Sequence, residues 1–161
     1  MKVSLVVVLA AAASVANAGF VYRSDGCPEP YERLDATRCV LADPFKLRKF
    51  KEALEFCSGH DGNLVTYDNC PDQLLIWDYI HSEETLASKS YWMGATDEEE
   101  EGTWFFTHEQ RVVPMGNPFW KHGEPSMSTN NNCAILQAAA NHRWVDISCT
   151  SSANVICLRN G

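Results

Sequence analysis

Residues 119–149 contain the side chains whose chemistry is easiest to interpret. They include an acidic residue before a proline, Glu124-Pro125, and a Ser/Asn-rich loop with neither helical nor strand periodicity. The oxygen-bearing side chains of interest are Glu124, Ser126, Asn130, Asn131, Asn132 and Asp146. Carboxylate and amide oxygens are ligands that Ca²⁺ prefers, and they also form hydrogen bonds with sugar hydroxyls. The alternative is an ordinary solvated surface loop, which clusters of Ser, Asn and Pro commonly form.

A second group of oxygens lies in residues 96–102, where Asp97 is followed directly by four glutamates that end at Glu101. Adjacent carboxylates repel one another unless a cation is close. The run therefore indicates either a second cation site or a solvated acidic turn.

The sequence offers little support for a catalytic site or for a nucleic-acid or membrane partner. The histidines are scattered along the chain, and neither a Ser or Cys nucleophile pattern nor a Gly-rich phosphate loop accompanies them. These observations argue against an enzyme. The net charge of −8 argues against a nucleic-acid or anionic-membrane partner, because no strongly basic region is evident.

The first eighteen residues are typical of a secretory signal peptide. An apolar run over residues 3–15 follows Lys2 and ends at Ala16-Asn17-Ala18, so we expect cleavage after Ala18. No other stretch approaches the length of a membrane-spanning helix. We therefore expect a secreted, extracellular protein with one domain over residues 19–161.

All seven cysteines follow the predicted cleavage point. In an oxidising compartment they indicate a disulfide framework with one cysteine left over, and the absence of a Cys-x-x-Cys pair argues against zinc. Spacing alone leaves the pairing open. A bridge from the first helix to the C-terminus would close the largest loop and contribute about 4 to 5 kcal/mol.

Periodicity and turn residues predict an α+β chain with both helices in the N-terminal half. The predicted helices are residues 45–56 and residues 71–81, and residues 31–40 form a predicted hairpin. The predicted strands are residues 63–67, 90–95, 103–106, 133–138 and 144–149.

Four motifs in this order resemble the C-type lectin-like domain family. They are Tyr91-Trp92-Met93-Gly94, Glu101-Gly102-x-Trp104, Trp120 followed by Gly123-Glu124-Pro125, and Trp144-Val145-Asp146-Ile147-Ser148-Cys149. The resemblance covers about residues 27–158. It implies two helices, two small antiparallel sheets and a long ligand-binding loop, stabilised by disulfides.

The resemblance also implies the cysteine pairing. The pairs are Cys27–Cys39, Cys57–Cys157 and Cys133–Cys149, which leaves Cys70 without a partner. Cys70 is then either a buried free thiol or the link of a covalent homodimer.

Carried over from sugar-binding members, the primary Ca²⁺ site falls on Glu124, Ser126, Asn131, Val145 and Asp146. Ser126 replaces an amide, Asn131 replaces a carboxylate, and Val145 has no side-chain oxygen, so the resemblance implies a weakened site. An auxiliary Ca²⁺ site falls on Asp97, Glu101 and Asn132, with Met127 where another acid is usual.

Two functions follow from the resemblance. The first is a secreted lectin that binds microbial surface glycans in innate immunity with the help of Ca²⁺, and Glu124-Pro125 favours mannose-type over galactose-type sugars. The second is a Ca²⁺-independent module of the same fold that binds a protein, lipid or mineral surface.

Overall fold

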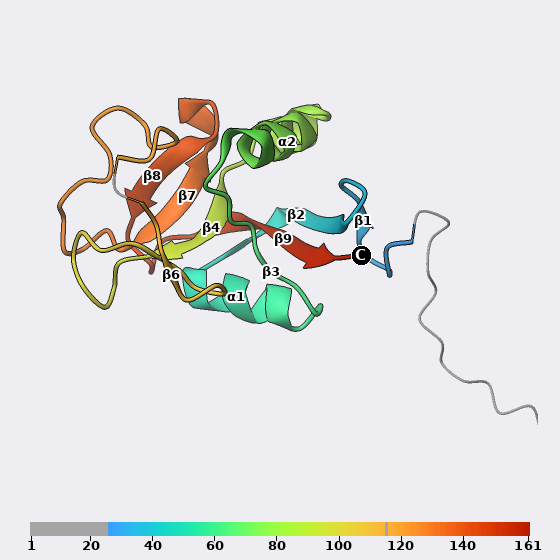
Figure 1. The fold of residues 1–161 in the computed structure, drawn as a ribbon, viewed down its shortest axis with the longest axis horizontal. Helices are drawn as coiled ribbons and strands as arrows, with labels where there is room; N and C mark the ends of the chain where they lie inside the picture. Colours follow the sequence, from blue (N-terminus) through green and yellow to red (C-terminus); the bar gives the residue numbers. More distant parts are fainter. Residues whose placement is uncertain (1–25, 115) are drawn as a thin grey trace, which may run out of the picture.

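The computed structural model describes residues 26–114 and 116–161, so the predicted signal peptide at residues 1–18 lies outside the described residues. A short hairpin opens the described chain. Strand β1 (Glu32–Arg33) pairs antiparallel with β2 (Arg38–Arg48), which in turn pairs with the C-terminal strand β9 (Ala153–Asn160). The beginning and the end of the domain therefore lie side by side (Figure 1).

The first helix, α1, covers Phe50–Ser58 rather than the predicted residues 45–56. Residues 45–48 belong instead to the end of β2, where Arg48 lies opposite Ala153 and its carbonyl accepts a hydrogen bond from Trp92 Nε1 at 2.7 Å. The helix begins after Lys49, whose backbone N–H donates to the Glu52 carboxylate at 3.1 Å. The predicted start of this helix was wrong: Leu47, which the predicted range included, lies in β2 and is 61% exposed.

The second helix, α2, covers Cys70–His81 and confirms the prediction within one residue. The Asn69 side chain accepts a hydrogen bond from the Asp72 backbone N–H at 2.9 Å, and Pro71 occupies the first turn, where its missing N–H costs nothing. The structure adds a short helix that was not predicted, α3 (Glu84–Ala87). None of the helices in the described part of the chain has the length and apolar composition needed to cross a bilayer.

The remaining strands form one mixed sheet with the terminal strands. They are β3 (Asn63–Leu64), β4 (Tyr91–Thr96), β5 (Phe105–Phe106), β6 (Arg111–Val112), β7 (Cys133–Gln137) and β8 (Arg143–Ile147), and a 3₁₀ turn, η1 (Ala138–Ala140), joins β7 to β8. The α+β class is confirmed. The two small antiparallel sheets implied by the resemblance are joined by a parallel pairing of β4 with β9.

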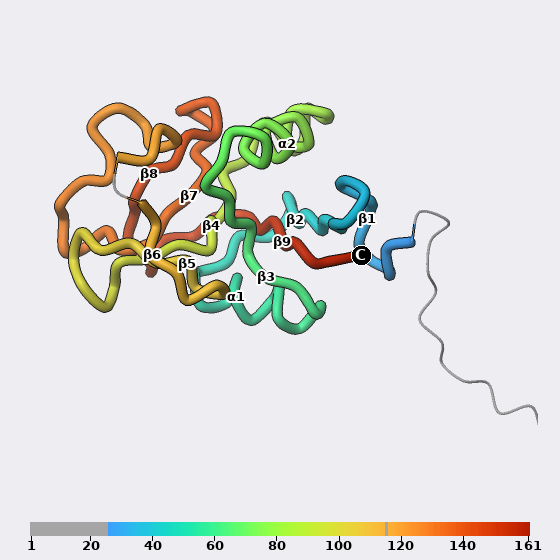
Figure 2. Tube along the Cα trace, viewed as in Figure 1, coloured from blue at the N-terminus to red at the C-terminus, as the bar shows by residue number. Residues whose placement is uncertain are grey.

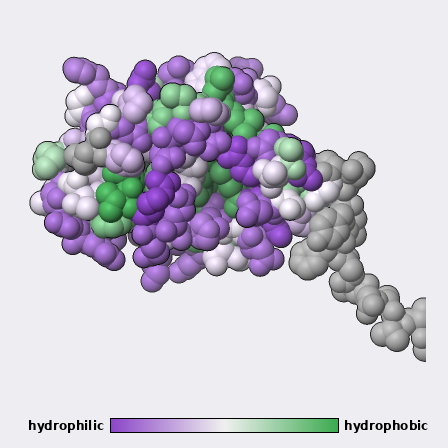
Figure 3. Space-filling view, viewed as in Figure 1, coloured by the Kyte–Doolittle hydropathy of each residue, from purple (hydrophilic) through white to green (hydrophobic). Residues whose placement is uncertain are grey.

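Helices α1 and α2 lie on opposite sides of these strands (Figure 1), and the trace in Figure 2 shows the long loop between β6 and β7 at the end of the molecule away from the C-terminus. Hydrophilic residues cover most of the face seen in Figure 3.

Buried side chains form two clusters. The first includes Tyr91, Met93, Leu136 and Trp144. The second includes the neighbouring strand residues that point the other way, among them Trp92, Ile135 and Val145.

The three disulfides lie in or against the second cluster and are the pairs that the resemblance implies: Cys27–Cys39, Cys57–Cys157 and Cys133–Cys149. Cys70 is a free cysteine, and it is exposed rather than buried.

Candidate functional site

The long loop enters the candidate site through a turn that the sequence did not reveal. The backbone N–H of Lys121 donates to the Trp144 carbonyl at 2.9 Å, and the Glu124 N–H donates to the Lys121 carbonyl at 2.9 Å. Gly123 has φ of +87°, a conformation that glycine adopts without strain, and the Glu124-Pro125 peptide is cis. This turn fixes Glu124 beside strand β8. The sequence analysis did not name Lys121 as part of the site. Its position three residues before Glu124, the spacing of a turn, could have suggested it.

Strand β8 supplies the second carboxylate. Asp146 lies opposite Ala134 of β7 and is 4% exposed. The Ser126 hydroxyl donates a hydrogen bond to Asp146 Oδ2 at 2.7 Å, and Asn131 Nδ2 donates to Ser126 Oγ at 3.4 Å. The structure thus brings together three of the predicted ligands from both ends of the loop.

Glu124 lies in the same place, next to Asp146. Burial and the adjacent Asp146 carboxylate raise the pKa of Glu124 to about 7, and the positive charge of Lys121 acts in the opposite direction. Glu124 Oε2 and Asp146 Oδ1 are buried and have no hydrogen-bond partner among the described residues. Two such acceptors close to each other repel, and a proton or a cation between them removes the repulsion.

Val145 precedes Asp146 on β8, but its side chain points to the opposite face. It lies opposite Ile135, belongs to the second buried cluster and is 5% exposed. Val145 therefore contributes packing where the family pattern has a ligand.

The auxiliary residues lie beside this group. Asp97 Oδ2 accepts a hydrogen bond from the Gly102 N–H at 2.9 Å, whereas Asp97 Oδ1 and Asn132 Oδ1 are buried without a partner in the described structure. Burial and the negative charge of Asp146 raise the pKa of Asp97. Glu101 is exposed, and desolvation together with the charges of Asp97 and Asp146 raises its pKa. The two predicted sites are therefore electrostatically coupled, which the sequence did not indicate.

These residues fit a hard cation such as Ca²⁺, because their donors are all oxygens and four of them lack a partner within the described chain. In the described residues, no group of three or more His, Cys, Asp or Glu side chains is arranged to hold a metal ion. A cation here would consequently need the neutral oxygens of Ser126, Asn131 or Asn132 as well as the carboxylates.

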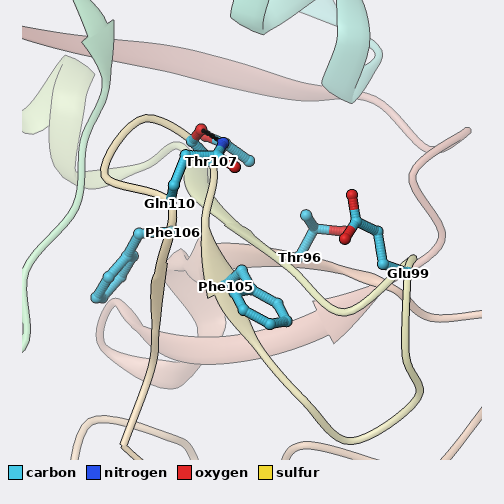
Figure 4. A pocket seen from close by; sticks show the side chains of 6 residues that line it. All are labelled: Thr96, Glu99, Phe105, Phe106, Thr107 and Gln110. Carbon is cyan, nitrogen blue, oxygen red and sulfur yellow. Dashed lines mark hydrogen bonds between the residues drawn. The ribbon is translucent and has the colours of Figure 1, made fainter.

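A separate pocket of about 190 Å³ lies against β4 and β5 and does not include Glu124 or Asp146. Figure 4 shows Thr96 and Glu99 at one end of it and Thr107 and Gln110 at the other, with the rings of Phe105 and Phe106 pointing in different directions. It has no cluster of buried unpartnered oxygens of the kind found around Asp146, so it is the weaker candidate.

Comparison with known proteins agrees with this geometry. The family model for the lectin C-type domain matches residues 46–159. A perlucin-like protein from Mytilus galloprovincialis is 27% identical over 144 residues, which cover 89% of both chains. Human tetranectin is 28% identical over 121 residues, 74% of this chain and 58% of tetranectin.

Two solved structures illustrate the range of the fold. The carbohydrate-recognition domain of the mouse scavenger receptor C-type lectin superimposes with a TM-score of 0.69 at 25% identity, covering 83% of this chain and 96% of that one. A calcium-independent type II antifreeze protein superimposes with a TM-score of 0.69 at 22% identity, covering 83% and 94%. At 22% identity the latter shows the fold alone. The family is one of non-enzymatic binding proteins, and carbohydrate is its characteristic ligand. The match over residues 46–159, together with the loop and disulfides described above, shows that this chain belongs to the C-type lectin domain family.

Proposed function

We propose that this protein is a secreted lectin that binds carbohydrate through a Ca²⁺ ion held by Glu124, Ser126, Asn131 and Asp146. The observation that carries the proposal is the pair of buried, unpartnered carboxylate oxygens on Glu124 and Asp146. Two hydrogen-bond acceptors without donors are costly in a folded protein, and such pairs mark sites completed by a ligand.

The chain's own residues have distinct roles in this proposal. Asp146 is fixed by the β7–β8 ladder, and Ser126 and Asn131 form a hydrogen-bonded chain that ends on it. Glu124 is held by the turn from Lys121. A bound Ca²⁺ supplies the charge and the open coordination positions on which vicinal sugar hydroxyls can bind. The side-chain oxygens then accept hydrogen bonds from the same hydroxyls.

The auxiliary residues Asp97, Glu101 and Asn132 would hold a second Ca²⁺. Its role would be to neutralise the carboxylates around Asp146, which is consistent with the charge coupling between the two groups. Removing Asp97 should then weaken binding at Glu124 without any direct contact to sugar.

We also propose the ligand class and setting. Glu124-Pro125 favours mannose-type over galactose-type sugars, and the predicted signal peptide favours secretion and a role in recognising microbial surface glycans. The decisive test is sugar binding on a glycan array in Ca²⁺ and in EDTA, preceded by calorimetric titration with Ca²⁺. Glu124→Gln should abolish both signals, and Glu84→Gln, an exposed acid on α3, serves as the matched control.

The alternative is a Ca²⁺-independent module that binds a protein, lipid or mineral surface. Two observations favour it: Val145 is turned into the core, and the Ser126 hydroxyl already satisfies Asp146 Oδ2. Binding that is equal in EDTA and unchanged by Glu124→Gln would establish this alternative.

Cys70 is the basis for a proposed disulfide-linked homodimer. Its exposure at the start of α2 leaves the thiol accessible to a second chain. Non-reducing mass analysis should find a Cys70–Cys70 peptide in the secreted protein and only monomer for Cys70→Ser.

A further inference from the structure

Charged side chains are distributed unevenly around the proposed sugar site. Residues 110–161 contain only two acidic residues, Glu124 and Asp146, although the whole chain contains 21. Both are proposed ligands of Ca²⁺, so a bound ion would neutralise them. The same stretch contains Lys121 and Arg143 next to the site, and we call these two residues the basic edge. We call residues 97–101, Asp-Glu-Glu-Glu-Glu, the acidic turn.

Hydrogen bonds fix the basic edge beside strand β8. The Lys121 N–H donates to the Trp144 carbonyl at 2.9 Å, so Lys121 lies beside the residue two positions before Asp146. Arg143 Nη1 donates to the Pro118 carbonyl at 3.1 Å, which holds the guanidinium at the entry of the long loop. Both side chains of the basic edge are exposed. An anion bound near Asp146 can therefore reach them from solvent.

The acidic turn lies at the other end of β8. Cys133 pairs with Ile147 at that end of the β7–β8 ladder, and the Asp97 N–H donates to the Asn132 carbonyl at 3.3 Å. Arg143 begins β8, four residues before Ile147, which is about 13 Å at the usual rise of a strand. Charges that far apart are largely screened at physiological salt, where the screening length is about 8 Å. Charge therefore changes from positive to negative along β8.

The acidic residues at the start of helix α2, beside the loop entry, are already paired. Asp68 forms an ion pair with Arg111 at 2.6 Å, and Asp72 forms one with Arg38 at 2.7 Å. The two residues of the basic edge form no ion pair among the described residues. With Ca²⁺ bound to Glu124, the basic edge therefore keeps its positive charge.

A hollow of about 240 Å³ adjoins the basic edge. Arg143 lines it together with the side-chain amides of Gln73 and Asn141. No acidic residue in the described part of the chain lines this hollow. Guanidinium and amide N–H groups both donate hydrogen bonds, so the hollow suits an acceptor such as an anionic oxygen.

We propose that the basic edge binds an anionic substituent, a sulfate ester or a carboxylate, on the sugar whose hydroxyls occupy the Ca²⁺ site. The inference rests on the proposed function, because Ca²⁺ must hold the sugar beside Asp146. Guanidinium and ammonium groups form charge-assisted hydrogen bonds with anionic oxygens. Lys121 lies beside Trp144, two residues from Asp146 or about 7 Å along the strand, a distance that one sugar ring with its substituent bridges.

The change of charge along β8 also selects the orientation of the sugar. Two vicinal hydroxyls can bind a Ca²⁺ ion in two orientations, related by half a turn. In one of them an anionic substituent lies against the basic edge, and in the other it approaches the acidic turn, where like charges repel. A neutral sugar lacks this preference. The basic edge therefore acts on specificity, while the Ca²⁺ site acts on binding itself.

The test compares methyl mannoside with its 6-sulfate and its uronate, by calorimetry with the full secreted protein in Ca²⁺ and in EDTA. A charge at carbon 6 leaves the vicinal ring hydroxyls free for Ca²⁺. We expect both anionic sugars to bind about tenfold more tightly than the neutral one, as one added charge-assisted contact would produce. The preference should shrink as salt is raised. Tighter binding of only one anionic sugar would assign the basic edge to sulfate esters or to carboxylates.

Substitutions in the basic edge should lower the ratio of anionic to neutral affinity. Arg143→Gln and Lys121→Gln should each reduce the ratio, and the double variant should bring it to about one, whereas Arg143→Lys keeps the charge and should keep most of the ratio. The ratio is the readout because the charge of Lys121 also acts on Glu124. Lys51→Gln, an exposed change on α1 with the same effect on net charge, is the matched control and should leave the ratio unchanged.

The outcomes separate this inference from the proposed function. Equal affinity for neutral and anionic sugars, or a ratio that the double variant retains, would overturn the inference and leave the proposed function intact. Binding of the anionic sugars alone, equally strong in EDTA, would overturn both, because the basic edge would then act without Ca²⁺. No binding of any of the three sugars would also overturn both.

Discussion

The second buried cluster and the long-loop site lie on opposite faces of strand β8 and differ in how their polar groups are satisfied. In the cluster, Trp92 is fully buried, its ring contacts Phe50 edge-on, and its indole N–H has an acceptor. On the other face, Asp146 and Glu124 are held together with acceptor oxygens that have no donor. The Trp92 indole in the second cluster is thus satisfied, whereas Glu124 and Asp146 keep acceptor oxygens in an electrostatically unfavourable state that a ligand can relieve.

The disulfides offer the largest test of this contrast. Cys57–Cys157 joins α1 to β9 across 100 residues, whereas Cys133–Cys149 closes a loop of 16 residues at the base of the site. By loop-closure entropy, Cys57→Ala/Cys157→Ala should lower the free energy of unfolding by about 4 to 5 kcal/mol, and Cys133→Ala/Cys149→Ala by about 3 kcal/mol. Urea melts of the two variants measure the difference. Both bridges lie in or against the second cluster, so equal losses would mean that loop length does not set the contribution of either bridge.

The aromatic residues give the next comparison. Trp92→Ala should cost about 3 to 5 kcal/mol, because it leaves a cavity in the second cluster and an unpaired Arg48 carbonyl. Trp120→Ala should cost less, because Trp120 is only partly buried, against Trp104 and Trp144 at the loop entry. Denaturant melts in the reverse order would contradict the deeper burial of Trp92.

Val145 is next to Asp146 on β8, but its side chain lies in the second cluster. Restoring the family's ligand with Val145→Asn places an amide opposite Ile135 in the second cluster, where an unpaired polar group costs about 1 to 3 kcal/mol. We expect lower stability in urea and no gain in Ca²⁺ affinity by calorimetry. Tighter Ca²⁺ binding at unchanged stability would show that the asparagine reaches the site instead.

The smallest effect concerns pH. The pKa of Glu124 is raised from 4.5 to about 7 in the folded protein, so its contribution to stability is fully present below about pH 4.5 and is lost as the pH rises through 7. In EDTA, the melting temperature should therefore fall between pH 5 and pH 8 by an amount that corresponds to about 1 kcal/mol after solvent screening. Glu124→Gln should remove this fall, as should saturating Ca²⁺. A fall that persists in Glu124→Gln would assign the effect to another group.

Much of the protein follows from its sequence. The buried strand Tyr91–Thr96, helix Cys70–His81 with its Asn69 cap and Pro71, and the α+β class depend on local patterns of apolar, turn and capping residues. The motifs that resemble the family also implied the cysteine pairing. Side-chain chemistry marked the oxygen-bearing residues of the loop as candidates, and the resemblance to the family singled out Glu124, Ser126, Asn131 and Asp146 among them.

The tertiary structure decided what local patterns leave open. The apolar residues from Leu47 onward are spaced as in a helix, but Arg48 pairs with β9 and its carbonyl accepts a hydrogen bond from Trp92, which keeps residues 45–48 in a strand. In this strand Phe45 and Leu47 are exposed. The direction of Val145 depends on the register of β8 with β7, and the coupling of Asp97 to Asp146 depends on two loops meeting in space. The strand pairing, the register and the charge coupling all depend on residues from different segments of the chain meeting in space. The spacing of apolar residues within one segment does not determine such contacts.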